Sequence, residues 1–349
     1  MATFLFVVPR FHTNLFFATR ALIATGHRVE VAAARIAGTE DHSHLVPIEI
    51  GRTPDAATLK ALMGKITPDL VLVRGPDRLS SDVARAARGS GSTVLRYDQR
   101  PYTRRTSLGR RLKNALAGRP AKRVTPIPGL ASDAPPDPMA HYVPFPVEAS
   151  PVEPRARDHD DGPVRILCVG KLWQRRKNQP LVIDALRRLD APERRIALTL
   201  VGSSARTISG ADEAHYDGLA EAARTSDWID LRVDVPFGEM AGLYARHDIC
   251  VLPSVDEPLG SAPIEAMAYG TIPVISTGAG SAGYVDDGVT GFRVDVAEAG
   301  ALERALGRLV DDPALRACMS EAARRFVEAE LSPARYVARM EALLPRRRR

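Results

Sequence analysis

The alternation of short apolar runs with helical segments, which occurs twice along the chain, most constrains the fold. Apolar runs at residues 4–8, 29–32 and 70–73 are separated by segments whose apolar residues recur at helical spacing. Strands that alternate with helices favour a parallel sheet with helices on both faces. The same alternation begins again at residues 164–169 and continues to residues 272–276. The sequence therefore predicts two doubly wound α/β halves.

A proline-rich stretch separates the two halves. Residues 126–154 hold nine of the 27 prolines and no long periodic segment, and a polar run follows them. This composition predicts a linker, and a length of 349 residues fits two domains. We expect an N-terminal domain at 1–150 that includes the linker, a C-terminal domain at 151–330, and a helix with a basic tail at 331–349.

Charge and cysteine content indicate which ligands and which cellular compartment suit the protein. The formal net charge is +6, and only six of the 48 basic residues are lysines, so guanidinium groups that suit phosphate-like anions dominate. Three cysteines are too few for a disulfide framework or a zinc ribbon. The longest uncharged stretch is broken by glycines and a proline, and the N-terminus does not resemble a signal peptide. We expect a cytoplasmic protein.

The stretch from residue 252 to residue 275 is the most informative part of the sequence. It begins at the end of a predicted strand, turns, and enters a helix predicted over 261–269. Free amides at the start of that helix favour a phosphate, and two carboxylates eight positions apart can accept hydrogen bonds from hydroxyls at two ends of one ligand. The predicted contacts are Glu257, Pro258, Leu259, Gly260, Ser261 and Glu265.

A basic loop follows the first strand of the C-terminal half. Gly170 permits a tight turn at the strand end, and Lys171 and Lys177 supply two cations beside it, with Arg176 next to the second. Cations at such a position stabilise the charge that builds on a departing phosphate. An exposed basic loop without a ligand is the alternative interpretation.

These segments resemble the retaining GT-B glycosyltransferases that use nucleotide-sugar donors, in particular glycosyltransferase family 4 (group 1). In that family the first glutamate, here Glu257, binds hydroxyls of the donor sugar, and the second, here Glu265, binds the ribose. The family's basic pair, here Lys171 and Lys177, holds the donor diphosphate. The spacing is one residue longer than the commonest form, which leaves Arg176 as an alternative to Lys177. Gly202 resembles the turn near the base pocket of the family.

The resemblance covers about residues 164–330 and implies both fold and activity. It implies the GT-B fold, in which two Rossmann-like domains face each other across a cleft. The C-terminal half would bind the donor and the N-terminal half the acceptor, and the sugar would be transferred to a hydroxyl with retention of configuration. Lys171, Lys177 and Glu257 would take part in catalysis. The nucleotide-diphosphate sugar would be a co-substrate, and no cofactor or metal is expected.

The N-terminal half resembles the family more weakly. The usual glycine-rich first loop is absent, and His12 lies in the segment that replaces it. Many members have a His-Asp pair after the fourth or fifth strand, where this chain has Tyr97 and Asp98. His12 or Asp98 could orient or deprotonate the acceptor hydroxyl, and a structural role is the alternative for each. The acceptor stays open among small molecules, glycans and lipid-linked compounds.

The segment from Arg100 to Arg123 contains nine basic residues and no acidic one. It is either a solvated helical face or a docking surface for a phosphorylated acceptor or an anionic membrane. Nucleic acid is not expected, because Tyr102 is the only aromatic residue in the segment that could stack on a base.

Two further motifs in the sequence are misleading. Residues 278–283 match G-x-G-x-x-G, but the turn-rich sequence that follows argues against a dinucleotide-binding helix. Asp158 and Asp160 match a D-x-D metal-binding motif, but they lie in the polar linker, where two solvated carboxylates are the simpler explanation.

The alternatives to catalysis of sugar transfer are a non-catalytic nucleotide-sugar-binding partner subunit, and an epimerase or phosphorylase on the same fold.

Overall fold

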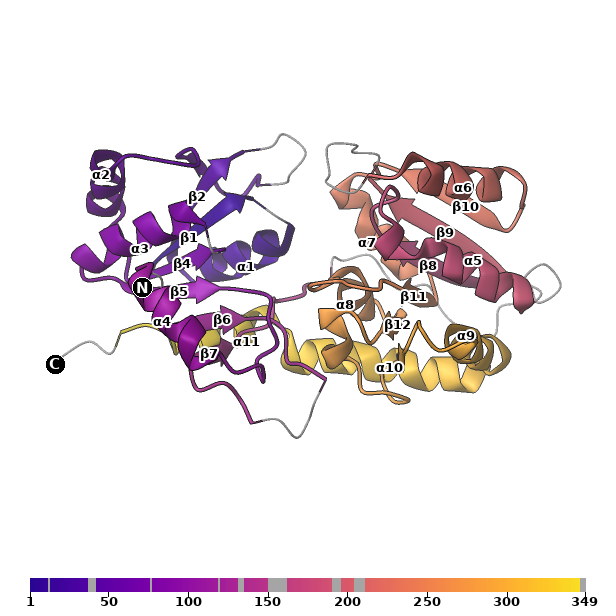
Figure 1. The fold of residues 1–349 in the computed structure, drawn as a ribbon. Coiled ribbons are helices and arrows are strands. Elements are labelled where there is room, and N and C mark those ends of the chain that lie inside the picture. Colours follow the sequence, from indigo (N-terminus) through magenta and orange to yellow (C-terminus); the bar gives the residue numbers. More distant parts are fainter. Residues whose placement is uncertain are drawn as a thin grey trace. The chain divides into compact units, whose positions relative to one another are not determined.

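The computed structural model describes residues 1–11, 13–36, 42–75, 77–118, 120–130, 135–149, 162–189, 196–203 and 211–345. The chain divides into two compact units, each built on its own parallel sheet (Figure 1). The N-terminal unit comprises Met1–Pro146 and Leu331–Arg349, and the C-terminal unit comprises Val147–Glu330. Among the described residues, no helix combines the length and the apolar character needed to cross a bilayer.

The N-terminal unit contains a seven-stranded parallel sheet in the order β3-β2-β1-β4-β5-β6-β7. Its strands are β1 (Thr3–Arg10), β2 (Arg28–Arg35), β3 (Ile48–Glu49), β4 (Leu70–Arg74), β5 (Thr93–Tyr97), β6 (Arg123–Thr125) and β7 (Ala140–Tyr142). Its helices are α1 (Thr13–Ala24), α2 (Ala56–Ile66), α3 (Arg78–Gly89), α4 (Leu108–Leu116) and α11 (Pro333–Glu341). The strand order reverses between β1 and β4, and ligands of such sheets bind at the carboxyl ends beside this point.

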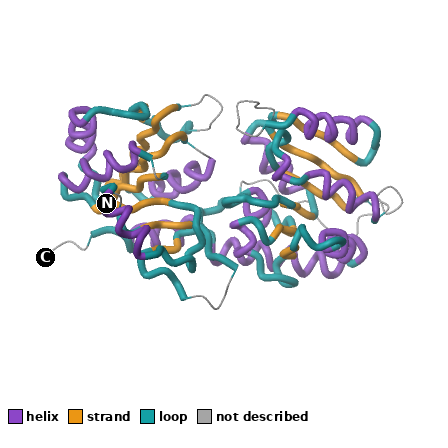
Figure 2. The backbone as a smooth tube through the Cα atoms, viewed as in Figure 1, coloured by secondary structure: helices purple, strands orange, loops and turns teal. Residues whose placement is uncertain are grey.

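The central strands of this sheet are buried on both faces, which explains their nearly continuous apolar sequences. One face packs on α2 and α3 through a cluster that includes Val7, Val73 and Leu62. On the other face, α1 and α11 pack against each other. Figure 2 shows the strands flanked by helices.

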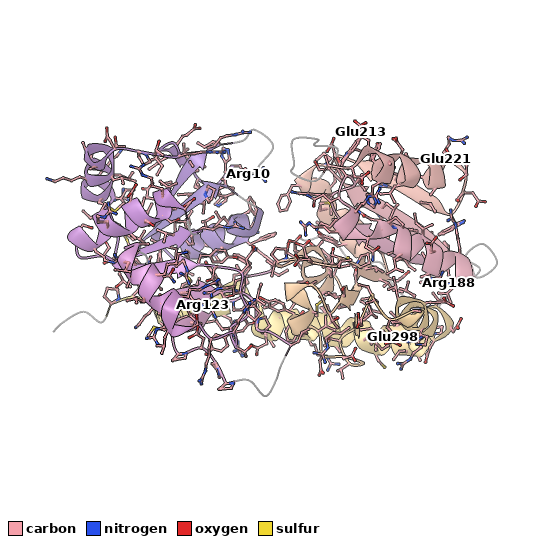
Figure 3. The ribbon with its side chains drawn as sticks, in the orientation of Figure 1. Arg10, Arg123, Arg188, Glu213, Glu221 and Glu298 are labelled. Atoms are coloured by element: carbon pink, nitrogen blue, oxygen red, sulfur yellow. The ribbon has the colours of Figure 1, made fainter. Side chains whose placement is uncertain are left out.

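Two short strands that the sequence did not predict lie at the edge of this sheet. β7 falls inside the segment predicted as a linker, and it pairs in parallel with β6. The Arg123 side chain of β6, labelled in Figure 3, is fully buried. It forms ion pairs with Asp98 at 3.0 Å and Asp137 at 3.3 Å. The linker prediction was therefore wrong for this part, because a charged network rather than an apolar pattern fixes the two strands.

The C-terminal unit contains a six-stranded parallel sheet in the order β10-β9-β8-β11-β12-β13. Its strands are β8 (Val164–Val169), β9 (Ile196–Gly202), β10 (Ile229–Val233), β11 (Ile249–Leu252), β12 (Ile272–Ser276) and β13 (Phe292–Val294). Its α-helices are α5 (Gln179–Arg188), α6 (Glu213–Arg224), α7 (Phe237–Arg246), α8 (Ala262–Met267), α9 (Ala301–Asp311) and α10 (Pro313–Glu330). Two 3₁₀ helices are η1 (Arg175–Lys177) and η2 (Gly280–Tyr284).

The last helix, α11, belongs to the N-terminal unit although it follows the C-terminal unit in sequence. Its residues Tyr336, Val337 and Met340 are buried, and it packs against α1. At its end, Glu341 lies 3.1 Å from Nε2 of His27, just before β2. The sequence predicts this helix over 333–344 but gives no sign of the unit on which it packs.

Candidate functional site

Two loops meet at the carboxyl ends of neighbouring strands in the C-terminal unit. One loop follows β8 and the other follows β11, and these strands pair in parallel. The Val255 amide donates to the carbonyl oxygen of Arg176 at 2.9 Å. The Asn178 side chain donates to the carbonyl oxygen of Pro253 at 3.3 Å. The basic loop after β8 is therefore joined to the loop after β11, called the glutamate loop because it carries Glu257. The two loops meet at the sheet edge where ligands of parallel sheets bind.

The Glu257 carboxylate lies against two cations of the basic loop. Arg176 donates to one carboxylate oxygen at 3.1 Å, and Lys177 forms a shorter ion pair with the same oxygen. The Lys177 and Glu257 side chains are each 11% exposed, and that of Arg176 is 39% exposed. Two cations against one carboxylate leave a net positive charge, which suits a phosphate group.

Two of the predicted glycines are required by the packing of these loops. Gly260 has a φ of +76°, and a Cβ atom added to it would lie 2.4 Å from Cδ2 of Leu252. A Cβ atom on Gly202 would lie 1.8 Å from the carbonyl oxygen of Gly170. A side chain at either position would displace the loops that carry the charged groups.

The segment after β12 supports the glutamate loop through its backbone. The Glu257 amide donates to the carbonyl oxygen of Gly278 at 3.2 Å, and the Gly280 amide donates back to the carbonyl oxygen of Glu257 at 2.9 Å. The Ser281 amide donates to the carbonyl oxygen of Leu259 at 2.8 Å. The G-x-G-x-x-G match thus lies in a loop and the single turn of η2, as the sequence analysis predicts.

Glu265 lies on α8, where it contacts a tyrosine of α7. The Tyr244 hydroxyl donates to the Glu265 carboxylate at 2.9 Å. Burial raises the pKa of Glu265, and hydrogen bonds from the Ser261 and Tyr244 hydroxyls partly oppose this effect. Burial also raises the pKa of Tyr244 well above its ordinary value, so the phenol remains a proton donor. The remaining lone pairs of the carboxylate can accept hydrogen bonds from a ligand.

Helix α8 is shorter than predicted, with six residues in place of the nine expected over 261–269. A six-residue helix aligns few peptide dipoles. The amides of Leu259, Gly260 and Ser261 donate to no described group, so they are available to a ligand. Because the helix dipole is small, the attraction for a phosphate depends more on the charges of Arg176 and Lys177 than on the helix.

The other predicted residues of this loop system lie in different surroundings. Pro258 is exposed, whereas the Leu259 side chain is 5% exposed and packs inward, so only its backbone can reach a ligand. Lys171 begins the basic loop, and its carbonyl oxygen accepts from the Gln179 side chain at 3.3 Å. Arg176 and Lys177 form ion pairs with the Glu257 carboxylate.

Asp98 of the N-terminal unit is surrounded by guanidinium groups. Arg96 lies 3.1 Å from its carboxylate, Arg100 lies 2.8 Å from it, and Arg123 lies 3.0 Å from it. Taking a proton from an acceptor would require these ion pairs to be broken, so the geometry favours a structural role for Asp98. His12, Asp158 and Asp160 lie outside the described residues.

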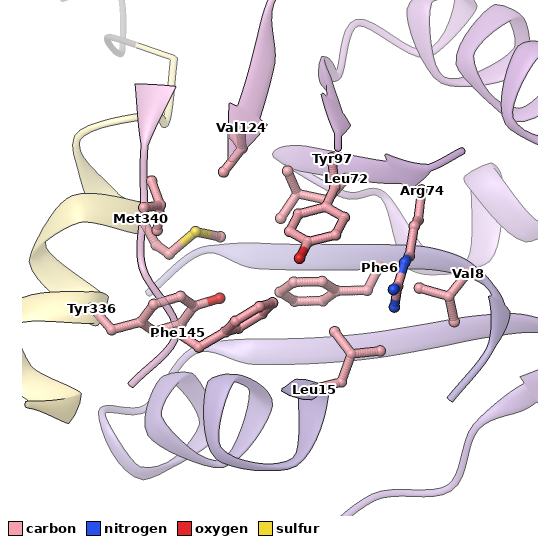
Figure 4. A pocket seen from close by; sticks show the side chains of 11 residues that line it. Phe6, Val8, Leu15, Leu72, Arg74, Tyr97, Val124, Phe145, Tyr336 and Met340 are labelled. Carbon is pink, nitrogen blue, oxygen red and sulfur yellow. The ribbon is translucent and has the colours of Figure 1, made fainter. Parts of the chain in front are cut away.

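A pocket opens beside β4 and β5 in the same unit (Figure 4). Most of its lining is apolar, including Phe6, Leu72 and Phe145, and its polar members include Arg74 and Tyr97. The Tyr97 hydroxyl is buried and makes no hydrogen bond of ordinary geometry with a described residue. The Arg74 guanidinium lies 5.4 Å from the centre of the Tyr97 ring, and burial lowers the pKa of Arg74. No described residue forms an ion pair with Arg74, so the pocket has a cation available for an anionic group.

Sequence reasoning missed Tyr244 and Arg74 as site residues. Tyr244 precedes Glu265 by 21 positions on another helix, so no local spacing connects them. Arg74 ends a strand that the apolar pattern predicts as 70–73, and its position at a carboxyl end was the available signal. Within the described part of the chain, no three His, Cys, Asp or Glu residues come together as metal ligands.

Two Rossmann-like units of this kind define the GT-B class of fold, and solved structures of the class resemble the whole chain. Sucrose-phosphate synthase from Thermosynechococcus elongatus aligns with a TM-score of 0.72 at 20% identity, covering 98% of both chains. Anabaena HepE in complex with UDP and glucose aligns with a TM-score of 0.71 at 15% identity, covering 98% of this chain and 99% of that one. At these identities the likeness concerns the fold alone.

The family model described as glycosyl transferases group 1 matches residues 150–326, about half of the chain, and the chain belongs to this family. A D-inositol 3-phosphate glycosyltransferase of Arthrobacter sp. (strain FB24) is 34% identical over 164 residues, which cover 46% of this chain and 38% of the relative. A glycogen synthase of Mycobacterium tuberculosis (strain H37Rv) is 32% identical over 176 residues, which cover 50% and 41%. The matches span about two fifths of the length of these curated relatives.

Proposed function

We propose that the protein transfers a sugar from a nucleoside-diphosphate sugar to an acceptor hydroxyl, with retention of anomeric configuration. The observation that carries the proposal is the position of Glu257 against Arg176 and Lys177, at the same strand edge as Glu265. Family membership supports the reaction class. Retention is supported by the resemblance of the two glutamates and their spacing to the signature of retaining members.

Each group in the site has a proposed role. Arg176 and Lys177 pair with the donor diphosphate, Glu257 accepts hydrogen bonds from the sugar hydroxyls, and Glu265 accepts them from the ribose. As the bond from the anomeric carbon to the diphosphate oxygen breaks, its electron pair passes to that oxygen, where the two cations stabilise it. The acceptor oxygen bonds to the anomeric carbon, and its proton leaves with the diphosphate. The proposed chemistry uses no metal.

The acceptor is proposed to bind at the carboxyl ends of the strands of the N-terminal unit, near Arg74 and Tyr97. Because Arg74 has no described ion-pair partner, an acceptor that carries an anionic group suits it. The Tyr97 hydroxyl can donate to such a group, since burial raises the pKa of Tyr97 and keeps the phenol protonated. Small molecules, glycans and lipid-linked compounds all remain within this proposal, as does contact between residues 100–123 and an anionic membrane.

We place the reaction in the cytoplasm. The three cysteines are free: Cys168 and Cys250 are buried, and Cys318 is exposed. Free cysteines are typical of proteins in a reducing compartment, which supports this proposal.

Nucleotide binding tests the donor site directly. Isothermal titration with a panel of nucleoside diphosphates should identify one that binds, and Lys177→Ala should weaken its binding at least tenfold, about 1.4 kcal/mol, because a charge-assisted contact is lost. Lys60→Ala is the matched control, since Lys60 is an exposed lysine of α2 in the other unit. Equal affinities for wild type and Lys177→Ala would remove Lys177 from the site.

Catalysis needs a separate test, because a partner subunit could bind the donor without transferring the sugar. Wild-type protein supplied with donor alone should slowly release free sugar, and Glu257→Ala should abolish this release while the fold is retained. With an acceptor present, the NMR coupling constant at the anomeric proton of the product should report the donor's own configuration. Inversion would contradict retention, and a requirement for inorganic phosphate would indicate a phosphorylase.

A further inference from the structure

Helix α4 of the N-terminal unit carries an exposed row of leucines. Leu108, Leu112 and Leu116 are 79%, 64% and 83% exposed. They follow one another at intervals of four, so at about 100° per residue they occupy a stripe about 80° wide. Asn114 is 8% exposed and marks the side of the helix that faces the protein. On the helical wheel Asn114 lies nearly opposite the centre of the leucine stripe, so the leucines point away from the fold.

Basic side chains border the leucine row. Arg111 and Lys113 lie about 100° to either side of its centre on the helical wheel, and both are exposed. Arg104, Arg105 and Lys122, which lie within a few residues of the helix in the sequence, are also exposed. None of these five residues forms an ion pair with a described residue. Their charges therefore remain available to an external partner.

This arrangement differs from an ordinary solvated helix. A solvated surface helix places its polar residues outward, whereas α4 places leucines outward and cations at their flanks. Burial of an exposed leucine in an apolar environment is favourable, and a basic side chain near an anionic leaflet adds electrostatic attraction. An apolar edge flanked by cations complements a surface that is anionic outside and apolar a few ångströms below, which is the interface of an anionic bilayer.

We propose that α4 is an interfacial helix that inserts Leu108, Leu112 and Leu116 into an anionic membrane surface. The helix would lie in the plane of the interface, with Arg111 and Lys113 at the level of the lipid headgroups. This proposal is independent of the donor chemistry, because none of these residues belongs to the proposed donor site. Failure to bind membranes would leave the proposed sugar transfer unaffected.

Vesicle binding of the full-length protein tests the proposal. Vesicles of phosphatidylcholine with about one third phosphatidylglycerol should bind the protein in a sedimentation assay, and pure phosphatidylcholine vesicles should bind it much more weakly. Leu112→Gln should lower the partition coefficient about tenfold, and Arg111→Gln should lower it about fivefold. Higher salt should weaken binding, because it screens the cations.

Matched variants separate insertion from general surface effects. Val46 is 87% exposed in the same unit and lies outside the basic segment, so Val46→Gln should leave partitioning unchanged. Arg52 is an exposed arginine of the same unit, and Arg52→Gln is the control for charge. Equal effects of Leu112→Gln and Val46→Gln would overturn the proposal.

Depth of insertion and self-association give the remaining tests. A tryptophan introduced by Leu112→Trp should show blue-shifted fluorescence, relative to wild type, when anionic vesicles are added. Binding without this shift would mean electrostatic docking only and would overturn insertion. Light scattering on the lipid-free protein should give the same mass for wild type and Leu112→Gln. A dimer that this substitution dissociates would identify the leucine row as a contact between two copies of the chain and would also overturn the proposal.

Discussion

At the scale of single residues, the candidate site depends on the ion pairs and hydrogen bonds of two carboxylates, those of Glu257 and Glu265. The spacing of Glu257 and Glu265 singles them out in the sequence. In the structure Glu257 lies in the loop after β11, and Glu265 lies on α8, which follows that loop at the same sheet edge. Tyr244, which donates to Glu265, has no local signal, because a hydrogen bond between helices depends on packing. Arg176 illustrates the same limit, since it and Lys177 both reach Glu257 and the sequence could only leave them as alternatives.

Glu265 leads to a prediction about pH. Burial holds its pKa above the ordinary value of 4.5, so the folded protein binds more protons there than the unfolded chain does as the pH rises above 4.5. The contribution of Glu265 to the free energy of unfolding of the wild type therefore falls as the pH rises above 4.5. Glu265→Gln keeps an acceptor for Tyr244 and removes the buried charge. Its Tm should exceed that of wild type by an amount that grows with pH, about 2–4 °C for each kcal/mol gained.

The same substitution should weaken nucleotide binding about tenfold or more, because a carboxylate is a stronger acceptor for ribose hydroxyls than an amide. Thermal unfolding across a pH series and calorimetric titration at neutral pH measure the two effects. Glu239→Gln, at an exposed glutamate of α7, is the control and should change neither quantity. A pH-independent difference in Tm would show that the charge of Glu265 is not the cause.

At the scale of elements, apolar periodicity identifies the longer strands and misses the shortest ones. β8 and β12 lie at the predicted residues 164–169 and 272–276, because each is an apolar run bounded by turn residues. β6 and β7 have three residues each, and a buried charged network holds β6 in place. No pattern of hydrophobic residues can reveal strands of this kind.

Arg123 tests how that edge is held. Arg123→Met should destabilise the N-terminal unit by about 3–5 kcal/mol, because it leaves the buried Asp137 carboxylate without its counter-charge and removes one of the three guanidinium partners of Asp98. Urea unfolding monitored by circular dichroism gives this value. Arg232→Met is the control: Arg232 pairs with Asp230 at 2.6 Å, but the two side chains are 47% and 51% exposed, so about 1 kcal/mol or less is expected. A similar small cost at Arg123 would show that the network does not hold the edge.

At the scale of the whole molecule, the sequence predicts two α/β units with a boundary near residue 150, but not the unit to which the last helix belongs. Each half repeats the strand-helix alternation, and this repetition carries the prediction. The return of α11 to the N-terminal unit depends on the burial of Tyr336, Val337 and Met340 against a unit that is distant in sequence. An amphipathic helix shows that it has an apolar face and does not show which surface covers it.

Separate cores predict separate unfolding transitions, which calorimetry can resolve. A nucleoside diphosphate at about 100 times its Kd should stabilise the C-terminal unit by about 2.7 kcal/mol, which raises that transition by about 5–10 °C. Met340→Ala should instead lower the other transition, since Met340 is fully buried and its truncation costs about 2–5 kcal/mol. The two effects should fall on different transitions although Met340 follows the C-terminal unit in sequence. If Met340→Ala moved the nucleotide-sensitive transition, α11 would belong with the C-terminal unit and the division of the chain would be wrong.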